Sequence, residues 1–91
     1  MGGKMYEFEW TKQAVRDFEK LSKSEYAKKG QELLEIVQKN PYQNPPWFKT
    51  LAGRFKGMIS RRISQQHRLV YEVIEEEKVV IIESMWTHYH E

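Results

Sequence analysis

The strongest constraint on the fold lies between residues 58 and 86, where three segments rich in β-branched and aromatic residues follow one another. Each has the length of an ordinary strand, and only short polar connections separate them, at Ser64–Gln66 and at Glu75–Lys78. Strands joined by such tight turns pair in sequence order as an antiparallel meander. The predicted strands are Met58–Ile63, His67–Ile74 and Val79–Trp86.

The preceding half of the chain changes from a strand pattern to a helical one. Tyr6–Trp10 alternates apolar and acidic residues, which predicts a strand with one buried face. Thr11 follows as a helix N-cap, and apolar residues then recur at helical spacing until Ser22–Ser24 interrupts them. A second helix is predicted from about Glu25 to Lys39, with Ser24 as its cap, so that the two helices form an antiparallel hairpin.

The connection between the helices and the meander is irregular. Asn40–Pro46 holds all three prolines and predicts a loop, and Lys49–Gly57 is expected to reach over the sheet with turns at its glycines. The order of elements predicts an α+β fold: an N-terminal strand, a helical hairpin and the meander, giving a four-stranded sheet covered by two helices on one face. Residues 1–91 are expected to form a single domain.

Several classes of protein are disfavoured by what the chain lacks. It has no cysteine, which excludes disulfides, thiol catalysis and cysteine-ligated zinc. No apolar run approaches the roughly 20 residues that cross a bilayer. The three histidines are not accompanied by acids at metal-ligand spacing. A cytoplasmic protein is expected, with no metal, cofactor or membrane contact.

Charge is strongly segregated along the sequence. The window from Lys39 to Tyr71 carries seven basic residues and no acidic one, while all thirteen acids lie outside it with eight basic residues, so the window has charge +7 and the rest −5. An ordinary solvated surface mixes the two signs. A one-sided basic segment predicts attraction to nucleic-acid phosphates, and a docking face for an acidic protein is the alternative. Arg54, Lys56, Arg61 and Arg62 are the candidate RNA or phosphate contacts.

Two arginines of the window are predicted to converge. Arg62 and Arg68 flank the first turn of the meander, so they can lie on neighbouring strands and on one face, whereas Arg61 points to the other face. Two guanidinium groups can hold one phosphate bidentately, which lysine does less well. The alternative is that each arginine pairs with a surface carboxylate such as Glu72 or Glu83.

The segment from Trp86 to Glu91 places two histidines and two aromatic residues after an apolar strand. His88 or His90 is able to act as a general acid or base near neutral pH, and Tyr89 or Trp86 to stack on a base. In the structural alternative, Trp86 is part of the core and Tyr89 covers the sheet edge. His67 lies on the core-facing side of its strand and is expected to be structural.

These residue types suit RNA cleavage without a metal. Such cleavage needs a base for the attacking 2′-hydroxyl, positive charge for the phosphorane and an acid for the leaving 5′-oxygen. Arg62 and Arg68 suit the second role and His88 the third. No base is obvious, because the basic window has no carboxylate and Lys49 needs a strongly lowered pKa to accept a proton.

The strings Ser60-Arg61-Arg62-Ile63 and His67-Arg68-Leu69-Val70-Tyr71, followed by the pair His88-Tyr89, resemble the Txe/YoeB family of toxins within the RelE/ParE-like superfamily. The resemblance covers nearly the whole chain. It implies a bacterial toxin that enters the ribosomal A site, cuts messenger RNA and is neutralised by a cognate antitoxin, with a homodimer as a further possibility. It also implies that Arg68 and His88 are catalytic, that Arg62 contacts phosphate, and that Tyr89 belongs to the site.

One position departs from the family pattern. The family usually has a glutamate two residues before the leucine at Leu51, as general base, and this chain has Lys49 there. Either the chain is a weakened variant that still binds the ribosome or the antitoxin, or Lys49 itself takes part in catalysis. A gyrase-poisoning toxin on the same fold is a third alternative, which the His88-Tyr89 pair and the arginine-rich strands disfavour.

Overall fold

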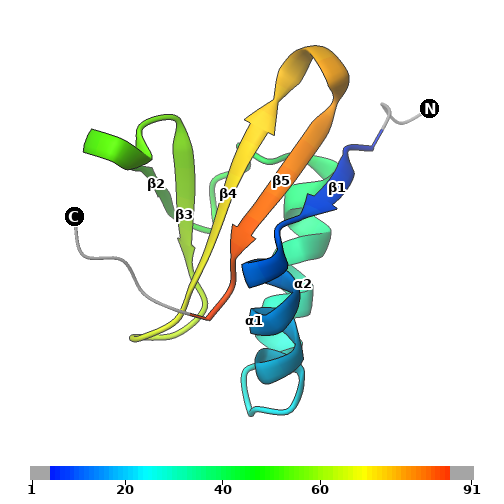
Figure 1. The fold of residues 1–91 in the computed structure, drawn as a ribbon, viewed down its shortest axis with the longest axis vertical. Helices are drawn as coiled ribbons and strands as arrows, with labels where there is room; N and C mark the ends of the chain where they lie inside the picture. The colour runs from blue at the N-terminus through cyan, green and yellow to red at the C-terminus, as the bar shows by residue number, and fades with distance from the viewer. Residues whose placement is uncertain (1–4, 87–91) are drawn as a thin grey trace.

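The computed structural model describes residues 5–86 and consists of two helices and one five-stranded mixed sheet (Figure 1). The strands follow the order β1-β5-β4-β3-β2 across the sheet. Their bounds are Glu7–Trp10 (β1), Phe48–Thr50 (β2), Met58–Arg62 (β3), Arg68–Ile74 (β4) and Val79–Ser84 (β5). The antiparallel meander β3-β4-β5 is therefore confirmed.

The predicted number of four strands is wrong, because Phe48–Thr50 adds a fifth. This segment was expected to reach over the sheet, and it pairs instead antiparallel with β3, with Lys49 opposite Ser60. A 3₁₀ turn, η1 (Gly53–Phe55), connects it to β3, and the left-handed backbone of Gly53 (φ 63°) and Gly57 (φ 95°) allows the reversal. A strand of three residues is too short for an alternating pattern to reveal it.

The helices are α1 (Lys12–Ser22) and α2 (Ala27–Lys39), close to the predicted ranges. The Oγ1 atom of Thr11 accepts a hydrogen bond from the Ala14 amide at 3.0 Å, which confirms the predicted N-cap of α1. Ser24 instead bonds the amide of Tyr26 in the turn between the helices, and α2 begins after Tyr26. The N-cap of α2, Tyr26, thus lies two residues after the predicted cap, Ser24.

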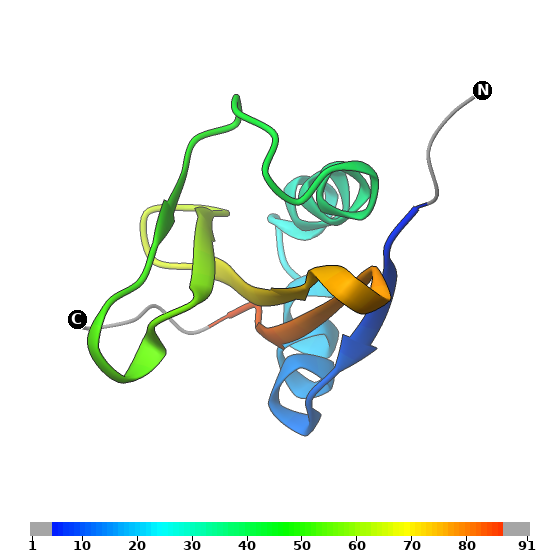
Figure 2. The same ribbon diagram turned by 90° about the horizontal axis from the view of Figure 1, so that it is seen from above.

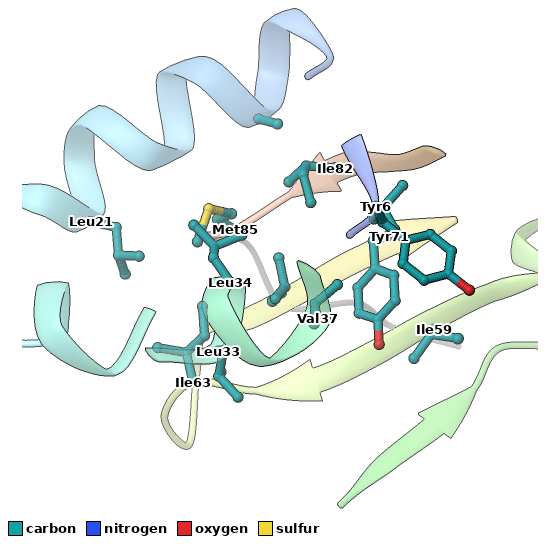
Figure 3. Packing of buried hydrophobic residues seen from close by; sticks show 13 residues of the cluster. Tyr6, Leu21, Leu33, Leu34, Val37, Ile59, Ile63, Tyr71, Ile82 and Met85 are labelled. Carbon is teal, nitrogen blue, oxygen red and sulfur yellow. The ribbon is translucent and has the colours of Figure 1, made fainter. Parts of the chain in front are cut away.

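The core lies between the helices and one face of the sheet, as Figure 3 shows. Leu21 of α1 and Leu33 and Val37 of α2 pack against Tyr71 and Ile82 of the central strands, and all five side chains are essentially buried. A Cβ added at Gly30 would meet the Leu21 side chain at 2.3 Å, so glycine there lets the two helices approach closely.

Strand β1 joins the sheet by parallel pairing with β5, with Glu7 opposite Val79 and Trp10 opposite Ile82. The sheet therefore has β1 at one edge and β2 at the other (Figure 1). In the part of the chain from residue 5 to residue 86, neither helix has the length and apolar character needed to span a membrane.

Candidate functional site

Arg62 and Arg68 lie directly opposite each other on β3 and β4, so the predicted convergence of these two residues is confirmed. The Nη1 atom of Arg68 donates to the Ser64 carbonyl in the intervening turn at 2.9 Å. Arg62 is exposed and, within residues 5–86, neither arginine bonds a carboxylate. The alternative in which they pair with Glu72 or Glu83 therefore does not hold. Like charges directly opposite one another across a ladder are destabilising, so this pair favours an external anion.

Lys49 extends the same face by one strand. It is exposed on β2 and lies opposite Ser60, two residues before Arg62 on β3. Residues directly opposite share a face, as do residues two apart on one strand. Lys49, Arg62 and Arg68 therefore form one basic face on the side of the sheet away from the helices. We call these three residues the basic face.

Arg54 and Lys56 do not join this group. Both are exposed in or next to η1, and the Arg54 guanidinium lies 5.2 Å from the centre of the Phe55 ring. Strand β3 runs from this end of the sheet to the Arg62 end, a distance of roughly 13 Å for its length. In Figure 1 the η1 turn between β2 and β3 lies at the upper left, and the turn between β3 and β4 lies at the lower left. They are placed to extend a charged track rather than to share one phosphate with Arg62.

Arg61 is a correction to the predicted phosphate contacts. Its side chain is fully buried on the core side of β3. Nε donates to the Tyr71 hydroxyl at 2.9 Å, and the terminal nitrogens donate to three backbone carbonyls of the loop before β2. The guanidinium carbon also lies 4.7 Å from the Phe48 ring centre. Four hydrogen bonds therefore hold the buried guanidinium inside the protein, so Arg61 cannot reach RNA and instead holds the loop onto the sheet.

Three carbonyls of that loop accept hydrogen bonds from the terminal nitrogens of Arg61. They are those of Pro41 (3.0 Å), Gln43 (2.9 Å) and Pro46 (2.6 Å). The parity of β3 already placed Arg61 on the core side, but nothing in the sequence identified its partners. A proline-rich loop is short of amide donors, since prolines have none, and its carbonyls need donors from elsewhere. Arg61 supplies them, and so fixes the chain that leads directly into β2 and Lys49.

The predicted His88 and Tyr89 lie outside the described residues, but the strand end before them is well defined. The Trp86 carbonyl lies 2.6 Å from Nδ1 of His67, and because a carbonyl only accepts, Nδ1 carries the hydrogen. The His67 ring also stacks on the Trp86 ring, with centres 4.0 Å apart. His67 is thus structural, as predicted, and Trp86 packs against the core.

Sequence reasoning missed a second contact that holds the end of β5, the hydrogen bond between Asp17 and the Met85 amide. Asp17 is fully buried on α1, and its carboxylate accepts from the Met85 amide at 3.0 Å and from Nε2 of Gln13 at 2.7 Å. The signal was available, since Asp17 falls on the same helical stripe as Ala14 and Leu21. A buried acid on such a stripe must find donors, and here one is the backbone just after β5.

A cleft of about 600 Å³ borders the basic face at the corner where α2, the end of the proline-rich loop and the β3–β4 turn meet. Trp47, which sequence reasoning did not single out, forms part of its wall and is 59% exposed. Arg62 lines the cleft and also belongs to the basic face. The remaining lining residues are Lys29, Pro46, Ile63, Ser64 and Gln65.

The other half of the sheet carries carboxylates. Glu72 lies on β4, and a register shift between Val70 and Tyr71 leaves Glu83 as an extra residue on β5. Burial, and then the neighbouring Glu72, raise the pKa of Glu83 above its usual value. Within residues 5–86 no three histidine, aspartate or glutamate side chains gather as metal ligands do.

Comparisons with known proteins identify the family and the fold. A family model described as the YoeB-like toxin of bacterial type II toxin–antitoxin systems matches residues 10–89. The fold is similar to a YoeB/ParE toxin from Agrobacterium tumefaciens, with 25% identity, a TM-score of 0.83, and coverage of 91% of this chain and 99% of that one. It is also similar to the toxin of a YoeB–YefM complex from Staphylococcus aureus, with 29% identity, a TM-score of 0.77 and coverage of 92% and 98%. A YoeB dimer from the same organism matches with the same values. No curated protein sequence matches the chain.

Proposed function

The chain belongs to the YoeB-like family of toxins from bacterial type II toxin–antitoxin systems, and on that basis we propose that it is a ribosome-dependent endoribonuclease that cuts messenger RNA in the A site. The observation that carries the proposal is the direct opposition of Arg62 and Arg68 with Lys49 on the same face. This arrangement suits a single phosphodiester, whose charge increases as it is attacked.

The chemistry proposed is attack of a 2′-hydroxyl on the adjacent phosphorus. The new P–O bond forms as the bond to the 5′-oxygen breaks, leaving a 2′,3′-cyclic phosphate on one fragment and a 5′-hydroxyl on the other. Arg68 and Arg62 stabilise the charge of the phosphorane, and His88, by the family pattern, protonates the leaving oxygen. Lys49 is the candidate to accept the 2′-hydroxyl proton, from the position where the family usually has glutamate.

Arg68→Ala is the test of this proposal. We expect at least an approximately 100-fold loss in the rate of ribosome-dependent cleavage, since a donor aimed at developing charge contributes about that much. Primer extension on messenger RNA bound to purified ribosomes measures the cut ends. Arg16→Ala, an exposed arginine on α1, is the matched control and should cleave like the parent. Equal cleavage by Arg68→Ala and the parent would contradict the proposal.

A second candidate function is a weakened toxin that occupies the ribosome or the antitoxin without efficient cleavage. Lys49 favours it, because a lysine ammonium group only donates hydrogen bonds, whereas the glutamate carboxylate usual at this position accepts a proton directly. Lys49→Glu separates the two: a large gain in cleavage supports the weakened toxin, unchanged cleavage counts against it, and reduced cleavage supports catalysis by Lys49 itself.

The proposed partners are the ribosome, messenger RNA and a cognate antitoxin. The Staphylococcus aureus relative was solved with YefM and also as a dimer, which supports an antitoxin partner and a homodimer for this chain. The gyrase-poisoning alternative receives no support from the basic face, which suits a single scissile phosphate. Unaltered supercoiling by gyrase in the presence of the protein would remove it.

A further inference from the structure

Trp47 lies in the wall of a basic cleft, and most of its side chain is exposed. It has the largest exposed fraction, 59%, among the large hydrophobic side chains described. Trp10 is exposed by 37%, but its ring packs edge-on against Phe18 with centres 5.5 Å apart. Across residues 5–86, no aromatic ring or cation stacks on the Trp47 indole. A largely exposed indole offers a broad flat face on which a ligand can stack.

The backbone beside Trp47 is held rigidly. The Pro46 carbonyl accepts a hydrogen bond of 2.6 Å from the buried Arg61, which also holds Gln43. Figure 2 shows how the segment after α2 arches out before it enters β2, so this anchor fixes an otherwise outlying stretch. A binding surface whose backbone is already fixed loses little conformational freedom when a ligand binds. The backbone that carries the indole is therefore held in place.

The other side chains of the cleft favour an anionic ligand. Lys29 of α2 and Arg62 of β3 are both exposed, and within the described residues neither bonds a carboxylate. Ser64 and Gln65 add polar groups at the turn, and no acidic residue from the stretch 5–86 lines the cleft. A flat aromatic wall together with two cations is the combination by which proteins bind single-stranded RNA. A cleft of about 600 Å³ is also within the usual range for small-molecule ligands.

We propose that this cleft binds one nucleotide of the RNA next to the scissile phosphate, with its base stacked on Trp47 and its phosphate held between Lys29 and Arg62. The inference rests on the proposed function, because Arg62 lines both the cleft and the basic face and so joins the two along one RNA strand. Stacking accepts every base, so the cleft orders the strand and does not read its sequence.

The test is direct binding of a fluorescein-labelled 2′-O-methyl RNA of eight nucleotides, which cannot be cleaved because its 2′-oxygen is blocked. We expect Trp47→Ala to weaken binding by roughly tenfold, the usual effect of losing one stacked base. Trp47→Phe keeps an aromatic face and should retain most of the affinity. Lys29→Gln should weaken binding severalfold, whereas Lys28→Gln, an exposed neighbour outside the cleft, should bind like the parent.

The result that overturns the proposal is equal RNA affinity for Trp47→Ala, Lys29→Gln and the parent, or no measurable binding by the parent. If the same substitutions weakened binding of an antitoxin peptide instead, the cleft would be assigned to a protein partner and the proposal would also fall. Cleavage on ribosomes by the parent and its loss in Arg68→Ala are measured separately. A failure of the cleft proposal can therefore be distinguished from a failure of the nuclease proposal.

Discussion

The two halves of the sheet carry opposite charge, and they differ in whether hydrogen bonds within the chain compensate a charged side chain. At the β1–β5 edge lie acidic residues, among them Glu7, Glu9 and the three glutamates of the 3₁₀ turn η2 (Glu75–Glu77). At the β3–β2 edge lie the basic face and the cleft. The division follows the sequence, since the acid-free window supplies the second edge and the flanking segments supply the first.

In the acidic half, Glu75 is compensated within the chain. The Glu75 carboxylate accepts from the Tyr6 hydroxyl at 2.8 Å, from the Tyr42 hydroxyl at 3.3 Å and from the Lys78 ammonium at 3.1 Å. The hydrogen bonds from Tyr6 and Lys78 hold the pKa of Glu75 below its usual value. Arg62 has no such partner among residues 5–86. Glu75 therefore stabilises the fold, whereas Arg62 is left available for a ligand.

The sharpest contrast is between Arg61 and Arg62, neighbours on β3 that point to opposite faces. Arg61→Met should lower the free energy of unfolding by at least about 3 kcal/mol, because the Gln43 and Pro46 carbonyls and the Tyr71 hydroxyl lose the donor that Arg61 supplies. Arg62→Met should change it by less than about 0.5 kcal/mol, since its side chain is exposed. Urea denaturation measures both. Similar losses for the two variants would contradict the division into structural and open charges.

A smaller effect is expected when the open charge alone is removed. Arg62→Gln should weaken RNA binding by about tenfold through loss of a charged hydrogen bond. It should also reduce the dependence of log affinity on log salt by about 0.7, the value for one phosphate contact on a single strand. Because the cross-strand repulsion from Arg68 is relieved, the protein should become slightly more stable. Arg16→Gln is the control, and an equal salt slope in the two variants would count against a phosphate contact.

The smallest effect concerns Glu83 in the acidic half. Its folded-state pKa is raised, so protonation favours the folded protein, and stability is lost as the pH rises from the ordinary value of 4.5 through the raised one. Glu83→Gln should remove that loss, with a gain of less than about 0.5 kcal/mol at neutral pH because the group is partly exposed. Thermal melts from pH 4 to pH 8 measure the change, with exposed Glu77→Gln as the control. A pH profile identical to that of the parent would contradict the prediction.

Local signals were enough to predict most of the fold and the centre of the site. The N-cap at Thr11 and the meander each depend on residues close together in sequence. The opposition of Arg62 and Arg68 followed from a short turn and the period of a strand, because a tight turn leaves little freedom of register. The roles of Lys49, His88 and Tyr89 came from the family resemblance and remain proposals.

What escaped prediction depends on contacts between distant parts of the chain. Strand β2 exists because β3 offers it a free edge, and its own three residues have no recognisable pattern. The burial of Arg61 depends on carbonyls 15 to 20 positions earlier in the sequence. Trp47 looked like an ordinary loop residue until the turn after β3 was placed beside it. None of these can be read from a window of neighbouring residues.

The parallel pairing of β1 with β5 joins residues 72 positions apart, Glu7 and Val79. Closing so long a loop costs conformational entropy before the pairing returns any energy, so this step should be late in folding, after the local hairpins. A chain whose synthesis stops before β5 would contain every arginine of the basic face and still lack the strand that joins α1 and β1 to the sheet. Interrupted translation should therefore yield unfolded fragments rather than partly active toxin.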